Sequence, residues 1–259
     1  MIEKNVDPDM RDAVIYGEFV SPTGLIYKSF ETVHHIIDPP TIAHMVDQRW
    51  MVILGIDTHE SDRNPHAVVF CAFTPGNEIV VFDEILKECL ISELAELIKE
   101  KLELWKIDYR FGITDISAKS AISGINHKAE LIRCGIKKLE TADKSKDTVQ
   151  EGRSKIKSLL DYEYDEATKT YKKKPGLFIS RDCQQLIWEF RHYIYANWAS
   201  SKMQDQRNPK EEARKKDDHL LDALRYVVHR NIKWRSKDFS LSKPKAGGKH
   251  LIRGVQFKG

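Results

Sequence analysis

Three acidic positions, far apart along the chain, have the residue type and placing that could carry out chemistry. Asp57 comes directly after one strongly apolar run, Asp115 comes directly after another, and Asp222 lies in 215-KKDDHLLDALRYVVH-229. Ligands of open α/β sheets bind at the carboxyl ends of strands, and an unpaired carboxylate there is costly to desolvate. A divalent cation is a suitable partner, since Mg²⁺ and Mn²⁺ prefer oxygen ligands. Together the three positions favour a metal site, although each alone is also a common turn or cap residue.

The segment 215–229 is predicted to be an amphipathic helix. At 100° per residue its large apolar side chains share one arc, Leu220, Leu221, Leu224, Val227 and Val228. The opposite side carries Asp218, Asp222 and Arg225, with His219 and Tyr226 along one flank. We expect the first half of this polar face to border a catalytic cleft and the rest to face water.

His219 and the acids at the start of this helix each have two interpretations. His219 stands three residues before Asp222, so the two lie on adjacent parts of the helix surface. It could be a metal ligand or proton shuttle, or a polar histidine with no such role. Asp217 and Asp218 could instead cap the helix, where the dipole favours negative charge, and this is our expectation for Asp217.

The chemistry that such a site suits is phosphodiester hydrolysis. Two cations roughly 4 Å apart can activate a water molecule and stabilise the leaving oxygen. Clustered aspartates without cations would repel one another and raise at least one pKa. The expected cofactor is therefore Mg²⁺ or Mn²⁺, with two ions bound.

Composition limits the class of protein without identifying it. The chain has 259 residues, 41% of them hydrophobic, and a formal net charge of +3, which by itself does not indicate a nucleic-acid-binding protein. Its four cysteines are widely separated, which is typical of reduced thiols rather than of disulfides or a zinc site. There is no signal peptide or apolar run long enough to span a membrane, so we expect a soluble intracellular protein.

The order of the predicted elements indicates one α/β domain. Strands over 50–56, 66–73 and 79–86 form a meander, the last two joined by a Pro-Gly-Asn turn. Helix–strand units follow, with helices over 92–105 (Ser92 as cap), 119–135, 147–160 and 182–195, strands over 110–114, 136–139 and 177–180, and an inserted hairpin or loop at 161–176. A mixed central β-sheet with helices on both faces satisfies this order. We expect a lead-in arm or linker at 1–49, the domain at 50–234 and a basic, flexible tail at 235–259.

Three stretches of the sequence together resemble a known family. They are 55-GIDTHESDRNPHAVVF-70, 144-KSKDTVQEGRSKIKSLL-160 and 216-KDDHLLDALRYV-227, of which the last is the most specific. The chain from about Gly17 to about Trp234 is similar to the nuclease domain of phage terminase large subunits, which has a ribonuclease-H-like fold. The lead-in resembles the segment that joins the ATPase domain of those proteins to the nuclease.

The resemblance implies particular site residues. Asp57, Asp115 and Asp222 would be the metal-binding and catalytic acids, and His219 would join them. Asp218 would be a further candidate ligand, because some relatives carry an acid near this position. Lys144 matches a lysine of many relatives, although a solvated surface lysine is the expected alternative.

The stretch 57-DTHES-61 departs from the family pattern. Relatives often have proline or glycine after the aspartate, and this chain has a threonine there and then His59. The role of His59 is therefore open. We expect a loop histidine near the cleft rather than a third ligand.

The function implied by the resemblance is a metal-dependent endonuclease that cuts concatemeric double-stranded DNA with little sequence specificity. Its partners would be the ATPase domain of the same protein, the portal and the small terminase subunit, in the cytoplasm of an infected bacterial host. No G-x-x-x-x-G-K-[ST] motif is present, so the chain cannot be the translocating motor by itself. We expect an excised nuclease domain rather than a phage remnant.

Basic clusters could supply the DNA contacts. They are Lys172–Lys174 in the insert and Arg207, Lys210, Arg214, Lys215 and Lys216 before the last helix, and both could flank a cleft beside the acids. Two alternatives stay open: another ribonuclease-H-like nuclease, such as a junction resolvase or transposase core, and a non-catalytic binding module whose acids are caps and ion-pair partners.

Overall fold

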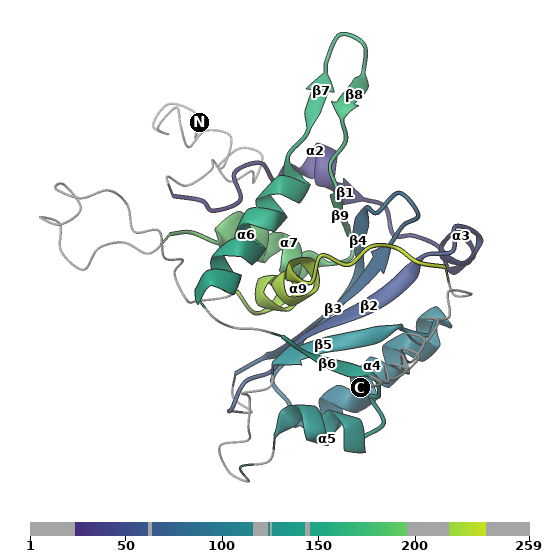
Figure 1. Ribbon diagram of the computed structural model, residues 1–259, viewed down its shortest axis with the longest axis vertical. Helices are drawn as coiled ribbons and strands as arrows, with labels where there is room; N and C mark the ends of the chain where they lie inside the picture. Colours follow the sequence, from purple (N-terminus) through teal and green to yellow (C-terminus); the bar gives the residue numbers. More distant parts are fainter. Residues whose placement is uncertain are drawn as a thin grey trace, which may run out of the picture.

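A seven-stranded mixed sheet forms the centre of the molecule, as the sequence predicts (Figure 1). The computed structural model describes residues 24–61, 64–115, 124, 126–142, 146–195 and 218–236. The strand order is β1-β9-β4-β3-β2-β5-β6, and β3 alone is antiparallel to its neighbours. The strands are β1 (Ile36–Ile37), β2 (Met51–Asp57), β3 (His66–Phe73), β4 (Ile79–Lys87), β5 (Phe111–Asp115), β6 (Leu139–Ala142) and β9 (Leu177–Ser180).

Helices cover both faces of this sheet, which confirms the predicted layering (Figure 1). One face is covered by α6 (Lys146–Leu160), α7 (Gln184–His192) and α9 (His219–His229), and the other by α4 (Ile91–Trp105) and α5 (His127–Arg133). Two short helices, α2 (Thr32–His35) and α3 (Ile42–Asp47), precede β2. Within the described residues, every helix is too short or too polar to cross a membrane.

The central strand β2 is buried along its whole length because it has a helical layer on each side. Ile53 packs in the core beneath α9, whereas Leu54 and Ile56 pack in the core beneath α4. This alternation follows from the two-residue period of a strand. It also determines that Gly55 and Asp57 point to the same face as Ile53, the face that α9 covers.

The segment expected to be a lead-in arm contributes to the domain core where the structure describes it. Ile26 and Tyr27 are buried in the core beneath α9, and Ile26 N donates to Tyr193 O at 2.9 Å. β1 pairs in parallel with β9 and forms one edge of the sheet. The boundary at 49 and 50 remains a prediction, and residues 1–23 lie outside the described part.

Several predicted element ends differ from those observed. α4 begins at Ile91, and the carboxylate of Glu93 accepts the backbone N–H of Leu90 at 3.0 Å, so Ser92 is not its cap. For the helix predicted over 119–135, residues 119–123 and 125 lie outside the described part, and α5 begins at His127, where the side chain of Asn126 caps it.

Three further elements are shifted or shortened. The strand expected over 136–139 runs from Leu139 to Ala142. The helix expected over 182–195 covers Gln184–His192. The last helix is described from His219, and Lys215, Lys216 and Asp217 lie outside the described residues.

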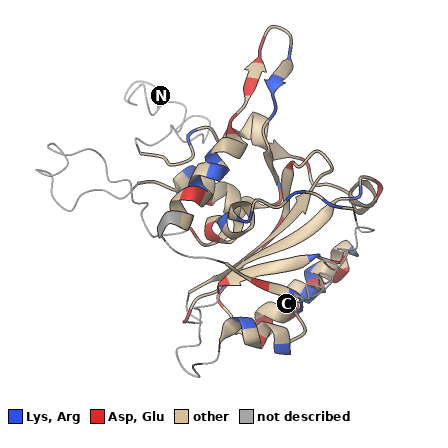
Figure 2. Ribbon diagram, viewed as in Figure 1, with Lys and Arg blue, Asp and Glu red and all other residues tan. Residues whose placement is uncertain are grey.

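The insert at 161–176 is predicted to be a hairpin or a loop. It is a two-stranded hairpin of β7 (Glu163–Asp165) and β8 (Thr170–Lys173). It leads into β9, whose first residue Leu177 pairs with Ile79 at the start of β4. Because β4, β9 and β2 run in the same direction, the hairpin leaves the sheet at the end opposite Asp57. The expectation that Lys172–Lys174 flank a cleft beside the acids is therefore wrong. Figure 2 shows acidic residues on β7 and basic residues on β8, so the hairpin is not uniformly basic.

Candidate metal centre

Asp57 and Asp115 end two neighbouring parallel strands at the same edge of the sheet. β2 and β5 pair with Ile56 opposite Thr114, and each aspartate is the next residue of its strand. Both are buried, at 2% and 4% exposure. Their place at the carboxyl ends of parallel strands is the usual position of ligand-binding groups in α/β sheets.

Helix α9 lies directly on β2 at Gly55. A Cβ atom added to this glycine would be 2.2 Å from the carbonyl oxygen of Ala223, so no other residue fits without displacing the helix. This close contact brings the first turn of α9, with His219, over the end of β2 where Asp57 lies.

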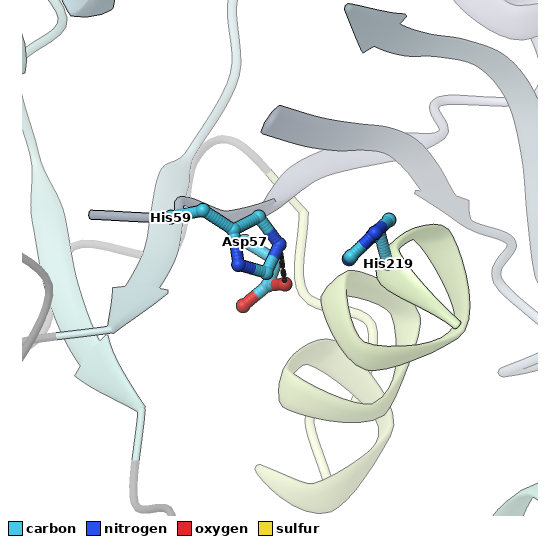
Figure 3. Close-up of side chains that lie close together, drawn as sticks. All are labelled: Asp57, His59 and His219. Carbon is cyan, nitrogen blue, oxygen red and sulfur yellow. Dashed lines mark ion pairs between the residues drawn. The ribbon is translucent and has the colours of Figure 1, made fainter. Parts of the chain in front are cut away.

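Asp57, His59 and His219 converge at this point (Figure 3). His59 Nε2 is 3.1 Å from Asp57 Oδ2, and the two imidazole rings are 4.4 Å apart with planes at 72°. One potential ligand atom from each residue lies within 4.8 Å of the other two. His59, expected near the cleft, thus lies in direct contact with Asp57.

His59 is held in place from the neighbouring strand. Its backbone N–H donates to Nδ1 of His66 at 3.1 Å, and His66 is the first residue of β3. Burial, and then the neighbouring His127, lowers the pKa of His66 to about 4, so this ring is neutral and Nδ1 can accept. The loop after β2 is therefore anchored beside Asp57 by His66, a residue that no pattern in the sequence singles out.

Tyr226 is a second site residue that sequence reasoning missed. Its hydroxyl donates to Asp57 Oδ1 at 2.6 Å, and the side chain is buried. Burial, followed by the charge of Asp57, raises the pKa of Tyr226 far above its usual value, so the hydroxyl stays a donor. Its spacing of seven residues from His219 is the one available signal, since this spacing places both on one side of a helix.

Asp222 lies one turn beyond His219 and is paired with Arg225. Its Oδ1 atom is 3.0 Å from the Arg225 guanidinium, whose side chain is 4% exposed. The expectation that this part of α9 faces water is therefore wrong, because α6 covers it. A Cβ atom on Gly152 of α6 would be 2.5 Å from Arg225 Cγ, so this glycine makes room for the arginine side chain.

Asp218 precedes α9 but its side chain does not cap the helix. The cap comes from Glu189 of α7, whose two carboxyl oxygens accept from the backbone N–H groups of Leu220 and Leu221 at 3.2 and 2.8 Å. Burial raises the pKa of Asp218 to about 6, and the charges of Asp222 and Asp57 add to this effect. Three carboxylates are therefore within electrostatic reach of one another at the start of α9.

The structure brings together some predicted site residues and not others. Asp57 and His219 converge, joined by His59; neither Asp115 nor Asp222 belongs to that close group among the described residues. Lys144, Asp217 and the basic residues at 207–216 lie outside the part of the chain that the structure describes.

Comparison of the sequence with known protein families identifies the family of this chain. The family model of the terminase ribonuclease-H-like domain matches residues 61–230, well over half of the chain, and the chain therefore belongs to this family. The match includes Asp115, Asp218, His219 and Asp222, and begins shortly after Asp57 and His59. No curated protein matched the chain. The mixed sheet flanked by helices is the ribonuclease-H-like fold that the sequence predicts.

Proposed function

We propose that this domain is a divalent-metal-dependent endonuclease that cuts double-stranded DNA for a viral packaging terminase. The family is that of a terminase nuclease module. The observation that carries the proposal is the convergence of Asp57, His59 and His219 at the carboxyl end of β2. A structural role alone gives no reason for two histidines of separate segments to meet a buried aspartate.

The donor atoms are spaced suitably for one cation. Two ligand atoms at about 2.1 Å from an ion are at most about 4.2 Å apart. The contact between His59 and Asp57 is 3.1 Å, and the whole group lies within 4.8 Å, so a small rotation of a ring is sufficient. Tyr226 fixes the orientation of the Asp57 carboxylate through Oδ1, which leaves Oδ2 directed towards His59.

The donor types favour Mn²⁺ over Mg²⁺ at this position. Imidazole nitrogen suits transition metals, whereas Mg²⁺ binds almost only through oxygen. A site with one carboxylate and two imidazoles therefore fits Mn²⁺ better. Asp57, Asp115 and Asp222 alone would suit Mg²⁺ and Mn²⁺ equally, and the two histidines shift the proposal to Mn²⁺.

The remaining acids fit a second ion. Asp115 ends the strand beside Asp57, and Asp222 and Asp218 stand at the start of α9. The Asp222 carboxylate is oriented by Arg225 through Oδ1, as Asp57 is by Tyr226. We propose that Asp115 and Asp222, with Asp218 as a further candidate, hold this ion.

Bound divalent ions would supply activation of a water molecule and stabilisation of the leaving oxygen of a phosphodiester. The protein residues orient the ligands. Burial, and then the charges of Asp222 and Asp57, raises the pKa of Asp218 to about 6, and a bound cation would favour the ionised form of these carboxylates. Within the described residues there is no feature that reads base edges, so little sequence specificity is expected. The proposed setting is concatemer cutting in an infected bacterial cytoplasm, with the ATPase domain, portal and small subunit as partners.

The test is cleavage of supercoiled plasmid with Mn²⁺, Mg²⁺ or EDTA. We expect nicking and linearisation with Mn²⁺, less with Mg²⁺ and none with EDTA. Asp57→Asn, Asp222→Asn and His219→Gln should each reduce cleavage at least 100-fold, since even residues behind the ligands often matter 10- to 100-fold. His229→Gln, at the other end of α9, is the matched control and should cleave like wild type.

Two outcomes would contradict the proposal. Cleavage that survives Asp57→Asn and His219→Gln in folded protein would show that these residues are not the site. Absence of cleavage with every cation, and of any rise in melting temperature with Mn²⁺, would favour a non-catalytic binding module.

A further inference from the structure

A basic cavity of about 710 Å³ lies at the opposite end of the sheet from the metal centre. Met51 and Val52, at the start of β2, and Arg110, just before β5, are among its lining residues. Met51 and Asp57 are six residue steps apart along the extended strand, which is roughly 20 Å at about 3.3 Å per residue. The cavity is therefore separate from the proposed nuclease site.

Five cationic side chains and one acidic side chain line the cavity, giving a formal charge of plus four. The cations come from four different segments of the chain and are Arg49, Lys106 and Arg110, Lys138, and Arg235. The acid, Asp108, lies 3.5 Å from Lys138. Like charges gathered around a concave surface repel one another, and an anionic ligand relieves that repulsion.

Three of these cations occupy backbone positions that disfavour their residue type. Arg49, Lys106 and Lys138 have φ angles of 54°, 51° and 56°. This left-handed region costs an L-residue energy and is normally occupied by glycine or asparagine. Half of the six described non-glycine residues with positive φ thus border one cavity and carry a positive charge. Lys106 takes this conformation as the C-cap of α4, where helices commonly end with a left-handed residue.

The cavity also has an apolar and aromatic lining. Met45 and Tyr109 are buried, and Trp50 is half-buried at the cavity wall. Tyr109 is held by its hydroxyl, which donates to the backbone oxygen of Lys137 at 2.6 Å. A volume of this size with apolar walls and a few charged groups is typical of sites for small organic ligands.

We infer that this cavity binds a nucleotide carrying two or three phosphates. Lysine and arginine side chains bind phosphate through charge-assisted hydrogen bonds, and four net positive charges suit a multiply charged anion. The planar base would lie against Trp50, since aromatic rings stack on bases of any type. A duplex DNA backbone would need the charges but not the aromatic and apolar lining.

The test is isothermal titration calorimetry of the whole chain with ATP in EDTA, which excludes metal-dependent cleavage. Three other ligands are titrated for comparison. Tripolyphosphate has the charge without the base, and adenosine has the base without the charge. A short DNA duplex presents backbone phosphates. We expect ATP to bind more tightly than all three. Trp50→Phe should weaken ATP binding and leave tripolyphosphate binding unchanged.

The left-handed positions allow a variant that separates binding from folding. The double variant Lys106→Gly and Lys138→Gly removes two cations where glycine is the less strained residue. We expect a melting temperature at or above that of wild type and ATP binding weakened at least tenfold. Lys169→Gly is the matched control, because Lys169 has φ 54° but lies on the β7–β8 hairpin, away from the cavity.

Four results would overturn the inference. If ATP binding is undetectable at millimolar concentration, the chain has no nucleotide site. If the double glycine variant binds ATP like wild type, the nucleotide does not bind in this cavity. Tripolyphosphate or adenosine binding as tightly as ATP would contradict the nucleotide assignment. Duplex DNA binding through Lys106 and Lys138 in place of ATP would assign the surface to a nucleic-acid backbone.

Discussion

Gly55→Ala tests whether the close packing of α9 on β2 builds the metal centre. The added Cβ would lie 2.2 Å from the carbonyl oxygen and 2.9 Å from the carbonyl carbon of Ala223. Both are backbone atoms within α9, so no side-chain rotation can relieve the contact. The helix must move away from β2 by about 1 Å to restore ordinary van der Waals distance.

The magnitude follows from two opposing effects. Overpacking a well-packed core costs about 1 to 3 kcal/mol, and a backbone clash belongs at the upper end. Alanine also restricts the unfolded chain, which stabilises by about 0.4 to 1 kcal/mol. We therefore expect the free energy of unfolding to fall by about 2 kcal/mol. The shift also moves His219 away from Asp57, so Mn²⁺ affinity and cleavage should fall on the order of 100-fold, the effect of a 1 Å misplacement.

Urea unfolding and Mn²⁺ titration measure the two effects separately. Gly76→Ala is the matched control, because its Cβ would be 2.6 Å from a Glu78 carboxylate oxygen, the movable end of a side chain. It should unfold within about 0.5 kcal/mol of wild type and bind Mn²⁺ normally. If Gly55→Ala unfolds and binds Mn²⁺ like wild type, the contact at Ala223 does not position the site.

Two other predictions concern residues behind the site. Tyr226→Phe should lower the free energy of unfolding by about 2 kcal/mol, since it removes a buried hydrogen bond to a charged group. It should also lower Mn²⁺ affinity by about 10- to 100-fold. Calorimetry that finds unchanged Mn²⁺ affinity would contradict an orienting role for Tyr226. Burial raises the pKa of Glu189 to about 9, so the folded state holds this proton more tightly than the unfolded chain. The stability of wild type relative to Glu189→Gln should therefore fall as pH rises from about 5 to about 9, by at most about 1.4 kcal/mol per pH unit. Melting temperatures of both proteins across this range test it, and a constant or increasing difference would contradict the raised pKa.

The pattern of side chains along the chain was sufficient to predict the sheet and its layers. The unbroken apolar run 50–56 indicated a strand buried on both faces, and β2 is buried along its whole length. The runs before and after the Pro-Gly-Asn turn gave the antiparallel pair of β3 and β4. These features are local, because burial on two faces and a tight turn each impose a residue type at every position.

Element ends and polar partners were less predictable. The sequence predicts Ser92 as the cap of α4, whereas Glu93 accepts the N–H of Leu90 before that helix. Asn126 caps α5 without having been predicted to do so. Arg225 has the spacing of a solvent-facing residue, yet α6 covers it and Gly152 makes room for its stem. A helical wheel gives the direction of a side chain but not what lies in that direction.

The family and the positions of the acids along the chain can be predicted from local patterns of residues. Asp57 and Asp115 are predicted because each comes directly after an apolar run, and Asp222 because it lies in a specific motif. Both signals consist of consecutive residues. The folded chain is needed to show that His59 meets Asp57 and His219, that Tyr226 donates to Asp57, and that a basic cavity lies at the far end of β2. Each of these depends on segments distant in sequence meeting in space, and no local pattern encodes which segments meet.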